Sequence, residues 1–369
     1  MRQNISFKII PFISLYAAAH LVADAACAYL LLGVLDLSSN AVLAMLIYNA
    51  AAFVLQAPFG LLIDKMLNPK LAAMTGLTLI AISFLFWNHV YAALIIVSIG
   101  NALYHVGGGC LVLSLKDRKA TFSGIYVAPG AIGLAVGAFL SVSEVSINLL
   151  AFPALLLFLC RLVYSVRTPA FNRSSESVRM KNFGFGVFVV ILIMVPIAVR
   201  SLIGLSINFS WKQNQHLLYA LLAALVLGKV FGGILADRYG LIRIGVGGLL
   251  ISAPLLAFHS ELPILGILGA FTFNFTMPVT LIAILNVLPQ YKGFSFGLTT
   301  VALFAGALPT ILNSNSWLKN EMMVLLLISL AATMLFLSLR FITKPGIPKT
   351  STHGLRNVVF KEPGTDHFH

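Results

Sequence analysis

Three ionisable side chains lie inside long apolar runs of this sequence, where a charge is unfavourable unless a partner or a function stabilises it. They are Asp24, Arg200 and Lys229. A charge in such a run is costly in lipid and usually faces a cavity or a partner. Asp24 and Arg200 lie about 16 and 17 residues into their runs, so the helical rise places them at similar depths. We therefore expect an Asp24–Arg200 ion pair, which either breaks when Asp24 takes up a proton or a ligand, or serves as a static structural pair.

Two histidines could extend this chemistry. His20 precedes Asp24 by four residues, which places both on one face of a helix, and His105 lies in another apolar run. Because imidazole titrates near physiological pH, the three residues could form a proton route, although hydrogen-bonded packing explains each histidine at least as well. No metal site is expected, because no third ligand follows at a suitable spacing. Three cysteines without CxxC spacing are expected to be reduced packing residues: Cys27, Cys110 and Cys160.

Lys229 has two interpretations. It lies eight residues before Asp237, which is about 12 Å from the end of its helix. It could snorkel to the interface or pair with Asp237, or it could attract an anion at the mouth of a cavity. The three charges within the runs sum to +1, which favours an anionic or neutral amphipathic ligand over an organic cation.

The composition identifies the elements that hold these residues. Of the 369 residues, 59% are hydrophobic and 9% are charged, whereas a soluble domain carries about 25% charged residues. Lipid is therefore the solvent for most of the chain. The apolar runs suit membrane-spanning helices of about 20 residues, without the alternation of barrel strands. Twelve runs lie at about 9–35, 40–62, 71–88, 90–115, 121–143, 147–166, 183–209, 215–236, 241–259, 262–288, 293–313 and 322–342.

The positive charges orient these predicted spans. With twelve spans, both termini lie on one side, and 20 of the 24 Lys and Arg residues fall on that side. Such asymmetry places both termini in the cytoplasm. It also accounts for the net charge of +13, so no nucleic-acid partner is expected.

The chain contains an internal repeat. Gly60 precedes Asp64 and Lys65 at the end of the second span, and Gly233 precedes Asp237 and Arg238 at the end of the eighth. The two copies lie 173 residues apart, which predicts two parallel six-helix bundles in an all-α membrane protein. We place the bundles at 1–166 and 183–343, with a cytoplasmic linker at 167–182 and a cytoplasmic tail at 344–369.

This repeat resembles the loop signature of the major facilitator superfamily, Gly-x-x-x-Asp-Arg/Lys-x-Gly. The second copy matches through Gly240, whereas the first has Leu67 where glycine is expected. The resemblance implies alternating access by two rocking halves. Physically, the acid of each copy can cap a neighbouring helix N-terminus and pair with the base when the cytoplasmic side is closed. The resemblance also implies a cavity lined by spans one, four, seven and ten. The candidate site residues on those spans are Tyr16, His20, Asp24, Asn101, His105, Arg200, Asn208 and Asn274.

A narrower resemblance is to bacterial exporters of the fosmidomycin-resistance type. It rests on His20 and Asp24, on the glycine-rich stretch 100–109 with His105, and on Arg200 followed by Ser201. Exporters of the superfamily carry Gly-Pro in span five, and this chain has Pro129-Gly130. The resemblance implies a location in the bacterial inner membrane and favours efflux.

Together these features predict a monomeric, proton-coupled secondary transporter of a small organic molecule, without a cofactor. Uptake or facilitated movement of a metabolite is the alternative direction. A membrane sensor or lipid-moving protein on the same scaffold is the alternative class. An enzyme is not expected, because no nucleophile–base pair or metal constellation appears in the sequence.

Overall fold

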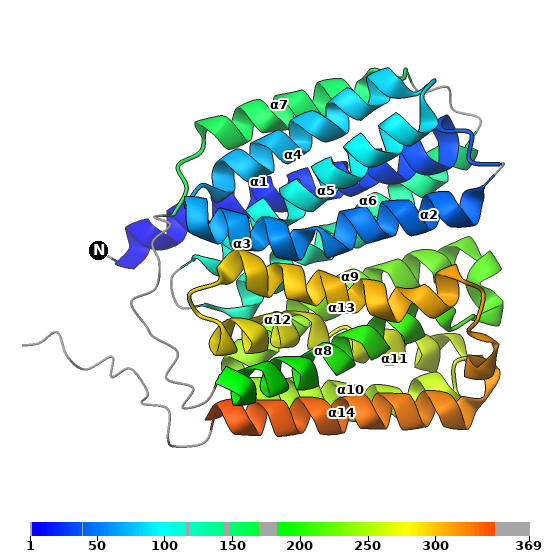
Figure 1. The fold of residues 1–369 in the computed structure, drawn as a ribbon. Coiled ribbons are helices and arrows are strands. Elements are labelled where there is room, and N and C mark those ends of the chain that lie inside the picture. Colours follow the sequence, from blue (N-terminus) through cyan, green and yellow to red (C-terminus); the bar gives the residue numbers. More distant parts are fainter. Residues whose placement is uncertain (1, 39, 116–117, 144–147, 170–182, 344–369) are drawn as a thin grey trace, which may run out of the picture.

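The computed structural model describes residues 2–38, 40–115, 118–143, 148–169 and 183–343, and the regular elements within these ranges are helices. Figure 1 shows them in two groups, one from the blue-to-green first half of the chain and one from the green-to-orange second half. The first group holds α1 (Arg2–Tyr29), α2 (Ala41–Asn49), α3 (Gln56–Met66), α4 (Pro69–Ser83), α5 (Val90–Leu113), α6 (Ala120–Val142) and α7 (Ala151–Ser165). The second holds α8 (Phe183–Ser206), α9 (Gln215–Tyr239), α10 (Leu241–Phe258), α11 (Pro263–Phe273), α12 (Thr276–Val287), α13 (Lys292–Ile311) and α14 (Glu321–Thr343).

The helices of the described chain form membrane spans. Eleven segments are helical, apolar and long enough to cross a membrane, and α7 is apolar but has 15 residues. Two spans contain two helices each: a π-helical turn at Ala50–Val54 separates α2 from α3, and α11 meets α12 at Asn274. The predicted all-helical architecture of twelve spans is confirmed. The bundle boundaries stay predictions, because residues 170–182 and the tail 344–369 lie outside the described residues.

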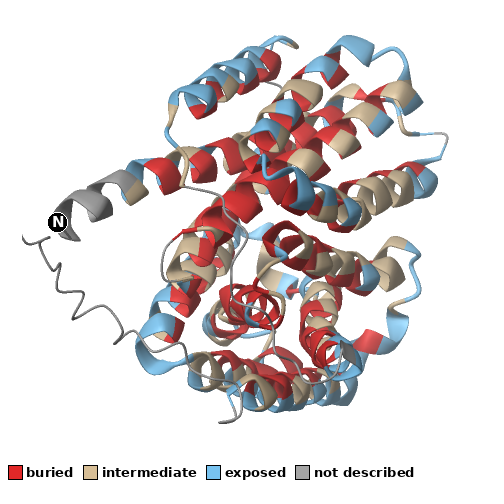
Figure 2. Cartoon of the chain, turned by 60° about the vertical axis from the view of Figure 1, so that its left-hand side comes forward, coloured by how far each residue is buried: buried red, intermediate tan, exposed pale blue. Residues whose placement is uncertain are grey.

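Burial follows a membrane pattern. In Figure 2, buried residues face the interior of each group, and exposed residues lie on the outward faces. Many outward residues are large and apolar, such as Leu155, Phe158 and Leu250. A water-soluble surface does not carry so continuous an apolar covering. The outer faces are therefore suited to lipid, whereas the polar residues His20, Asp24 and His105 are buried.

The ends of α3 and α9 differ in one residue of the repeat. After α9, Gly240 has a φ of +97°, and after α3, Leu67 has a φ of +58°. Glycine adopts positive φ freely, whereas a leucine pays a steric penalty of about 1–2 kcal/mol. The departure of the first copy from the glycine pattern thus introduces backbone strain at this turn. The turn is held by the Leu67 amide, which donates to the Ile63 carbonyl at 2.8 Å.

Replacement of Leu67 by glycine should therefore stabilise the protein by about 1 kcal/mol. Leu62 is the matched control, because it is a similarly exposed leucine in the interior of α3. Leu62→Gly should destabilise by about 1 kcal/mol, since glycine is unfavourable within a helix. Thermal unfolding in detergent measures both effects. A midpoint that falls in both variants would contradict the strain at Leu67.

Close packing of α1 on α6 fixes the residues of span one. A Cβ at Gly133 would lie 2.2 Å from the Leu21 carbonyl oxygen, and one at Gly137 would lie 2.3 Å from that of Ala25. Only glycine allows two helix backbones to approach so closely. The polar face of α1 is consequently held against α6 within the first group of helices.

Candidate functional site

The candidate site is a cluster of two imidazoles and one carboxylate inside the first helix group. His20 and Asp24 come from α1, and His105 comes from α5. His20 Nε2 lies 3.3 Å from Asp24 Oδ2, His105 Nε2 lies 3.2 Å from Asp24 Oδ1, and the two Nε2 atoms are 2.9 Å apart. All three residues are buried, with at most 9% of each exposed. The structure thus brings together the three residues of the predicted proton route.

Two neighbouring helices hold this cluster in place. His105 Nδ1 lies 2.9 Å from the Asn101 carbonyl oxygen one turn earlier in α5. The Tyr126 hydroxyl, from α6, donates to the His105 carbonyl at 3.2 Å. Gly130 of α6 packs directly against the side chains of Asp24 and His20, since a Cβ there would lie 2.5 Å from both Asp24 Oδ2 and His20 Nε2. The cluster therefore fills a space that α6 leaves open by the absence of a side chain.

The contacts specify where protons can lie. The Asn101 carbonyl only accepts hydrogen bonds, so His105 Nδ1 is the donor in that contact. The two facing Nε2 atoms need one proton between them, because two lone pairs do not form a hydrogen bond. That proton can be on either imidazole, and whichever Nε2 carries it can also donate to the Asp24 carboxylate, which lies 3.2–3.3 Å from both nitrogens. The two imidazoles and the carboxylate therefore face a shared position that can hold a proton.

Arg200 does not join this cluster, which corrects the predicted Asp24–Arg200 pair. In the described chain, the ion pairs of Asp24 are with His20 and His105. The Nε of Arg200, on α8, is buried and has no hydrogen-bond partner among the described residues. Two histidines already occupy the carboxylate.

Lys229 interacts electrostatically with Arg200, and it forms no ion pair with Asp237 among the described residues. Electrostatic interactions link Lys229, on α9, to both Arg200 and Asp24. Asp237 is engaged elsewhere, as described below. Two cations of the second helix group thus lie within electrostatic range of each other, and one of them is within range of the Asp24 cluster.

The other predicted site residues have different surroundings. Tyr16 is fully buried, its hydroxyl has no hydrogen-bond partner among the residues that the structure describes, and its carbonyl accepts from the Tyr104 hydroxyl at 2.6 Å. Asn274 donates to the Ala270 carbonyl one turn earlier, at 2.8 Å, at the break between α11 and α12. Asn208 lies beyond the end of α8 and is exposed. Asn208 therefore lies outside the span that was expected to hold it, because the helix ends earlier than its apolar run, and its place in the site stays a prediction.

Asn101 belongs to a second network beside the cluster. Its side-chain amide donates to the Tyr48 hydroxyl at 3.1 Å and to Cys27 Sγ at 3.4 Å. Sequence reasoning missed Tyr48 and Tyr126, because a tyrosine in an apolar run has no spacing signal that separates a site residue from a packing residue. Gly130 was the residue whose sequence context indicated the site, because glycines spaced along one face of a helix mark the close approach of a second helix.

The two repeat motifs form reciprocal helix caps between the groups. The Asp64 carboxylate accepts from the Gly293 and Phe294 amides at the start of α13, each at 2.9 Å. The Asp237 carboxylate accepts from the Ala120 and Thr121 amides at the start of α6, also each at 2.9 Å. A carboxylate at a helix N-terminus is stabilised by the free amides and the helix dipole. The predicted capping is confirmed, and each acid caps a helix of the other group. The expected pairing of each acid with the base of its motif is not found among the ion pairs of the described residues.

We call the end of the protein that carries these caps the motif side. There the backbones of the two groups touch, since a Cβ at Gly60 would lie 2.3 Å from the Gly293 carbonyl carbon and one at Gly233 would lie 2.5 Å from the Ala120 carbonyl oxygen. Lys65 and Arg238 are exposed at this side. The motif side is therefore closed in this structure.

The metal expectation also needs a correction. Sequence spacing offered no third ligand, yet the fold supplies one from a distant segment. Ligand atoms of His20, Asp24 and His105 all lie within 4.8 Å of one another. Local spacing cannot detect this set, because His105 is 85 residues away from His20 along the chain.

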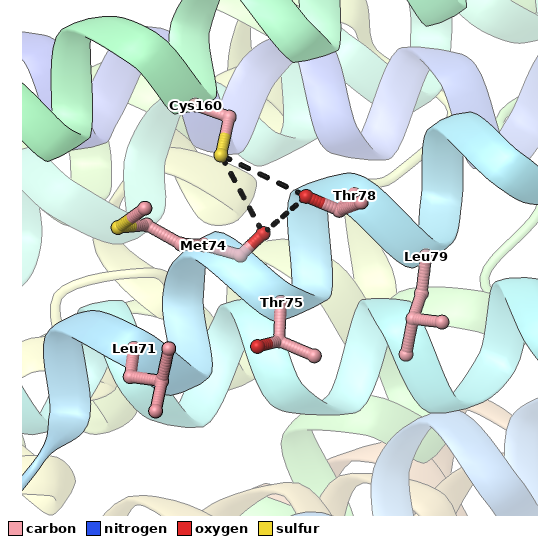
Figure 3. A pocket seen from close by; sticks show the side chains of 6 residues that line it. All are labelled: Leu71, Met74, Thr75, Thr78, Leu79 and Cys160. Atoms are coloured by element: carbon pink, nitrogen blue, oxygen red, sulfur yellow. Dashed lines mark hydrogen bonds between the residues drawn. The ribbon is translucent and has the colours of Figure 1, made fainter.

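A groove on the first helix group is a weaker candidate. It has a volume of about 270 Å³ and lies between α4 and α7. Figure 3 shows its lining side chains: Leu71, Met74, Thr75, Thr78, Leu79 and Cys160. Two of its polar groups are already bonded, since the Thr78 hydroxyl donates to the Met74 carbonyl at 3.0 Å and Cys160 Sγ donates to the same carbonyl at 3.7 Å. The groove holds no carboxylate, imidazole or cation, so we place the site at the Asp24 cluster.

Solved membrane transporters share this fold. The E. coli fucose:proton symporter FucP matches with a TM-score of 0.69 and 16% identity, over 91% of this chain and 99% of that chain. A structure of FucP in the outward conformation matches with a TM-score of 0.68, 16% identity and the same coverage. The human organic anion transporter MFSD10 (TETRAN) matches with a TM-score of 0.64 and 15% identity, over 89% of this chain and 98% of that chain.

This chain has the major facilitator fold. No family model and no curated protein matches its sequence. The major facilitator fold accounts for the two helix groups and for the pairing of the repeat motifs across them. The resemblance to exporters of the fosmidomycin-resistance type stays a prediction.

Proposed function

We propose that the protein is a secondary transporter that moves a small organic molecule by alternating access. The observation that carries this proposal is the buried cluster of Asp24, His20 and His105 within a major facilitator fold. Ionisable residues are rare inside membranes unless they serve a pathway or a partner. A cluster that holds a cation next to a carboxylate suits the coupling ion of a gradient-driven transporter, and we propose that this ion is the proton.

The cations of the second helix group support an anionic or neutral amphipathic substrate. Arg200 has a buried Nε that finds no hydrogen-bond partner in the described part of the chain, and Lys229 lies within electrostatic range of it. A guanidinium with unused donors is suited to bind a carboxylate or phosphate group. The human protein of the same fold is named an organic anion transporter. The substrate would thus lie between the Asp24 cluster, which binds the proton, and the cations Arg200 and Lys229, which attract an anion.

The direction that we propose is efflux in exchange for protons. Support comes from the Pro129-Gly130 pair in α6, whose glycine contacts both Asp24 and His20. The protein would lie in a bacterial inner membrane as a monomer, with the motif side and both termini in the cytoplasm. Uptake remains the alternative, because the E. coli protein of the same fold is named a symporter.

Reconstitution in vesicles that contain a lumenal pH dye tests this function. Amphipathic anions, neutral sugars and organic cations are added outside in turn. We expect one anionic or neutral compound to change the lumenal pH. Because an entering substrate drives protons out of the lumen in an antiporter, the lumen should become alkaline whichever way the protein is inserted. Acidification would show symport, and silence from folded protein across the panel would contradict coupled transport.

A further inference from the structure

We propose that His20, Asp24 and His105 form a binding site for a divalent transition-metal ion of the zinc type. Two imidazole nitrogens and a carboxylate oxygen, from α1 and α5, converge within 4.8 Å of one another. Each residue is more than nine-tenths buried. This inference concerns a different ligand from the organic substrate and does not rest on the proposed transport function.

The distances between the ligand atoms fit such an ion. A tetrahedral zinc site has metal–ligand bonds of about 2.0–2.1 Å, which separates neighbouring ligand atoms by about 3.3 Å. The two nitrogen–oxygen separations here are 3.3 Å and 3.2 Å, and the nitrogen–nitrogen separation is 2.9 Å. An ion at the centre requires the imidazoles to separate by only a few tenths of an ångström. The fourth position would take water or another small ligand, as in sites with three protein ligands.

The surroundings prepare His105 to act as a ligand. Its Nδ1 donates to the Asn101 carbonyl, so its Nε2 points into the cluster. Histidine ligands of metals are commonly oriented by such a bond from the other ring nitrogen. The Nδ1 of His20 is buried without a hydrogen-bond partner in the described chain, so no bond commits the His20 Nε2 to carrying a proton.

The chemistry of the ligands selects the class of ion. Imidazole nitrogens favour zinc, cobalt and nickel, whereas calcium and magnesium prefer sites made of oxygen atoms. The carboxylate supplies one negative charge to a divalent ion. Lys229 is the cation whose electrostatic interaction reaches this carboxylate, so it opposes metal binding. Gly130 leaves the space at the ligand atoms that a side chain would fill.

Titration of purified full-length protein with Zn²⁺ or Co²⁺ alone tests the site. The protein carries no histidine tag, and neither substrate nor a proton gradient is present. We expect one ion per chain with a visible Co²⁺ spectrum typical of four ligands, and at least about tenfold weaker binding in His105→Gln and in Asp24→Asn. His259→Gln is the matched control, because His259 is an exposed histidine, and its affinity should equal that of the wild type.

Two further variants keep the test decisive if removal of a ligand impairs folding. Gly130→Ala retains all three ligands but places a methyl group against two of them, and it should weaken binding. Lys229→Gln removes the opposing charge and should tighten binding. An affinity and a Co²⁺ spectrum that are unchanged in His105→Gln, Asp24→Asn and Gly130→Ala would overturn the site. Metal binding by a protein that moves no protons in vesicles would support the metal site and contradict the transport proposal. Proton movement by a protein that binds no metal would support transport and contradict the metal site.

Discussion

Asp24→Asn should abolish substrate-driven proton movement, down to the level of protein-free vesicles. Asparagine has nearly the same shape but neither binds a proton nor carries the charge that both histidines contact. The exchange of labelled substrate against unlabelled substrate should persist, because this reaction needs no net proton transfer. The measurement compares the two activities in the same vesicles, with the lumenal pH dye for protons and a labelled compound for exchange. Loss of one activity and survival of the other identifies a coupling residue.

Asp36 supplies the matched control for this substitution. It follows span one, is exposed, and its carboxylate accepts from the Ser38 hydroxyl at 2.6 Å. Hydrogen bonds from Ser38 lower the pKa of Asp36, so this carboxylate is charged at neutral pH. Asp36→Asn therefore also removes one negative charge, just beyond the end of span one. Proton movement should be unchanged in this variant. Wild-type proton movement in Asp24→Asn would contradict the role of the cluster.

The second large effect is expected at Gly60, where the two helix groups touch. A Cβ at this position would lie 2.3 Å from the Gly293 carbonyl oxygen and 2.6 Å from the Phe294 amide nitrogen. Both neighbours belong to the backbone and cannot turn away as a side chain can. Forcing an extra methyl group into such a contact costs about 1–3 kcal/mol. Gly60→Ala should therefore shift the equilibrium toward an open motif side about 5- to 150-fold.

Cys110 provides a native reporter of this opening. It is buried on α5, and its Sγ lies 3.8 Å from Asp64 Oδ1 at the closed motif side. In a background without the other two cysteines, the rate of Cys110 alkylation by a maleimide should rise with the open fraction. Gly247→Ala is the control, since no atom lies within 4 Å of a Cβ at Gly247. Equal alkylation rates in Gly60→Ala and wild type would show that this contact does not keep the motif side closed.

The fold was predictable because its signals are long and periodic. Apolar runs, the asymmetry of Lys and Arg, and the repeated Gly60 and Gly233 motifs together predicted twelve spans. Helix ends were less predictable, since an apolar run can continue past the last helical residue, as it does around Asn208. The break at Asn274 was visible as a polar interruption, but the π-helical turn at Ala50–Val54 carries no distinct sequence signal.

The site was predictable in its members but not in its pairing. Depth along a helix placed Asp24 and Arg200 at one level, and the i, i+4 rule placed His20 beside Asp24. Whether Asp24 pairs with Arg200 or with His105 depends on how α1, α5 and α8 are packed, which local spacing does not encode. The same limit explains why the approach of His105 to His20 and Asp24 could not be predicted.

The most direct test of the account is whether the two ends of the protein open alternately. One pair of spin labels is placed at Lys65 and Arg243, which are exposed on the two groups at the motif side. A second pair is placed at Val42 and Leu312, which are exposed at the other end. Each pair reports the opening of its own end. The distances are measured with and without the compound that moves protons in vesicles. We expect one distance to lengthen as the other shortens. Distances that stay fixed at both ends, in every condition, would contradict alternating access and favour a membrane sensor on the same scaffold.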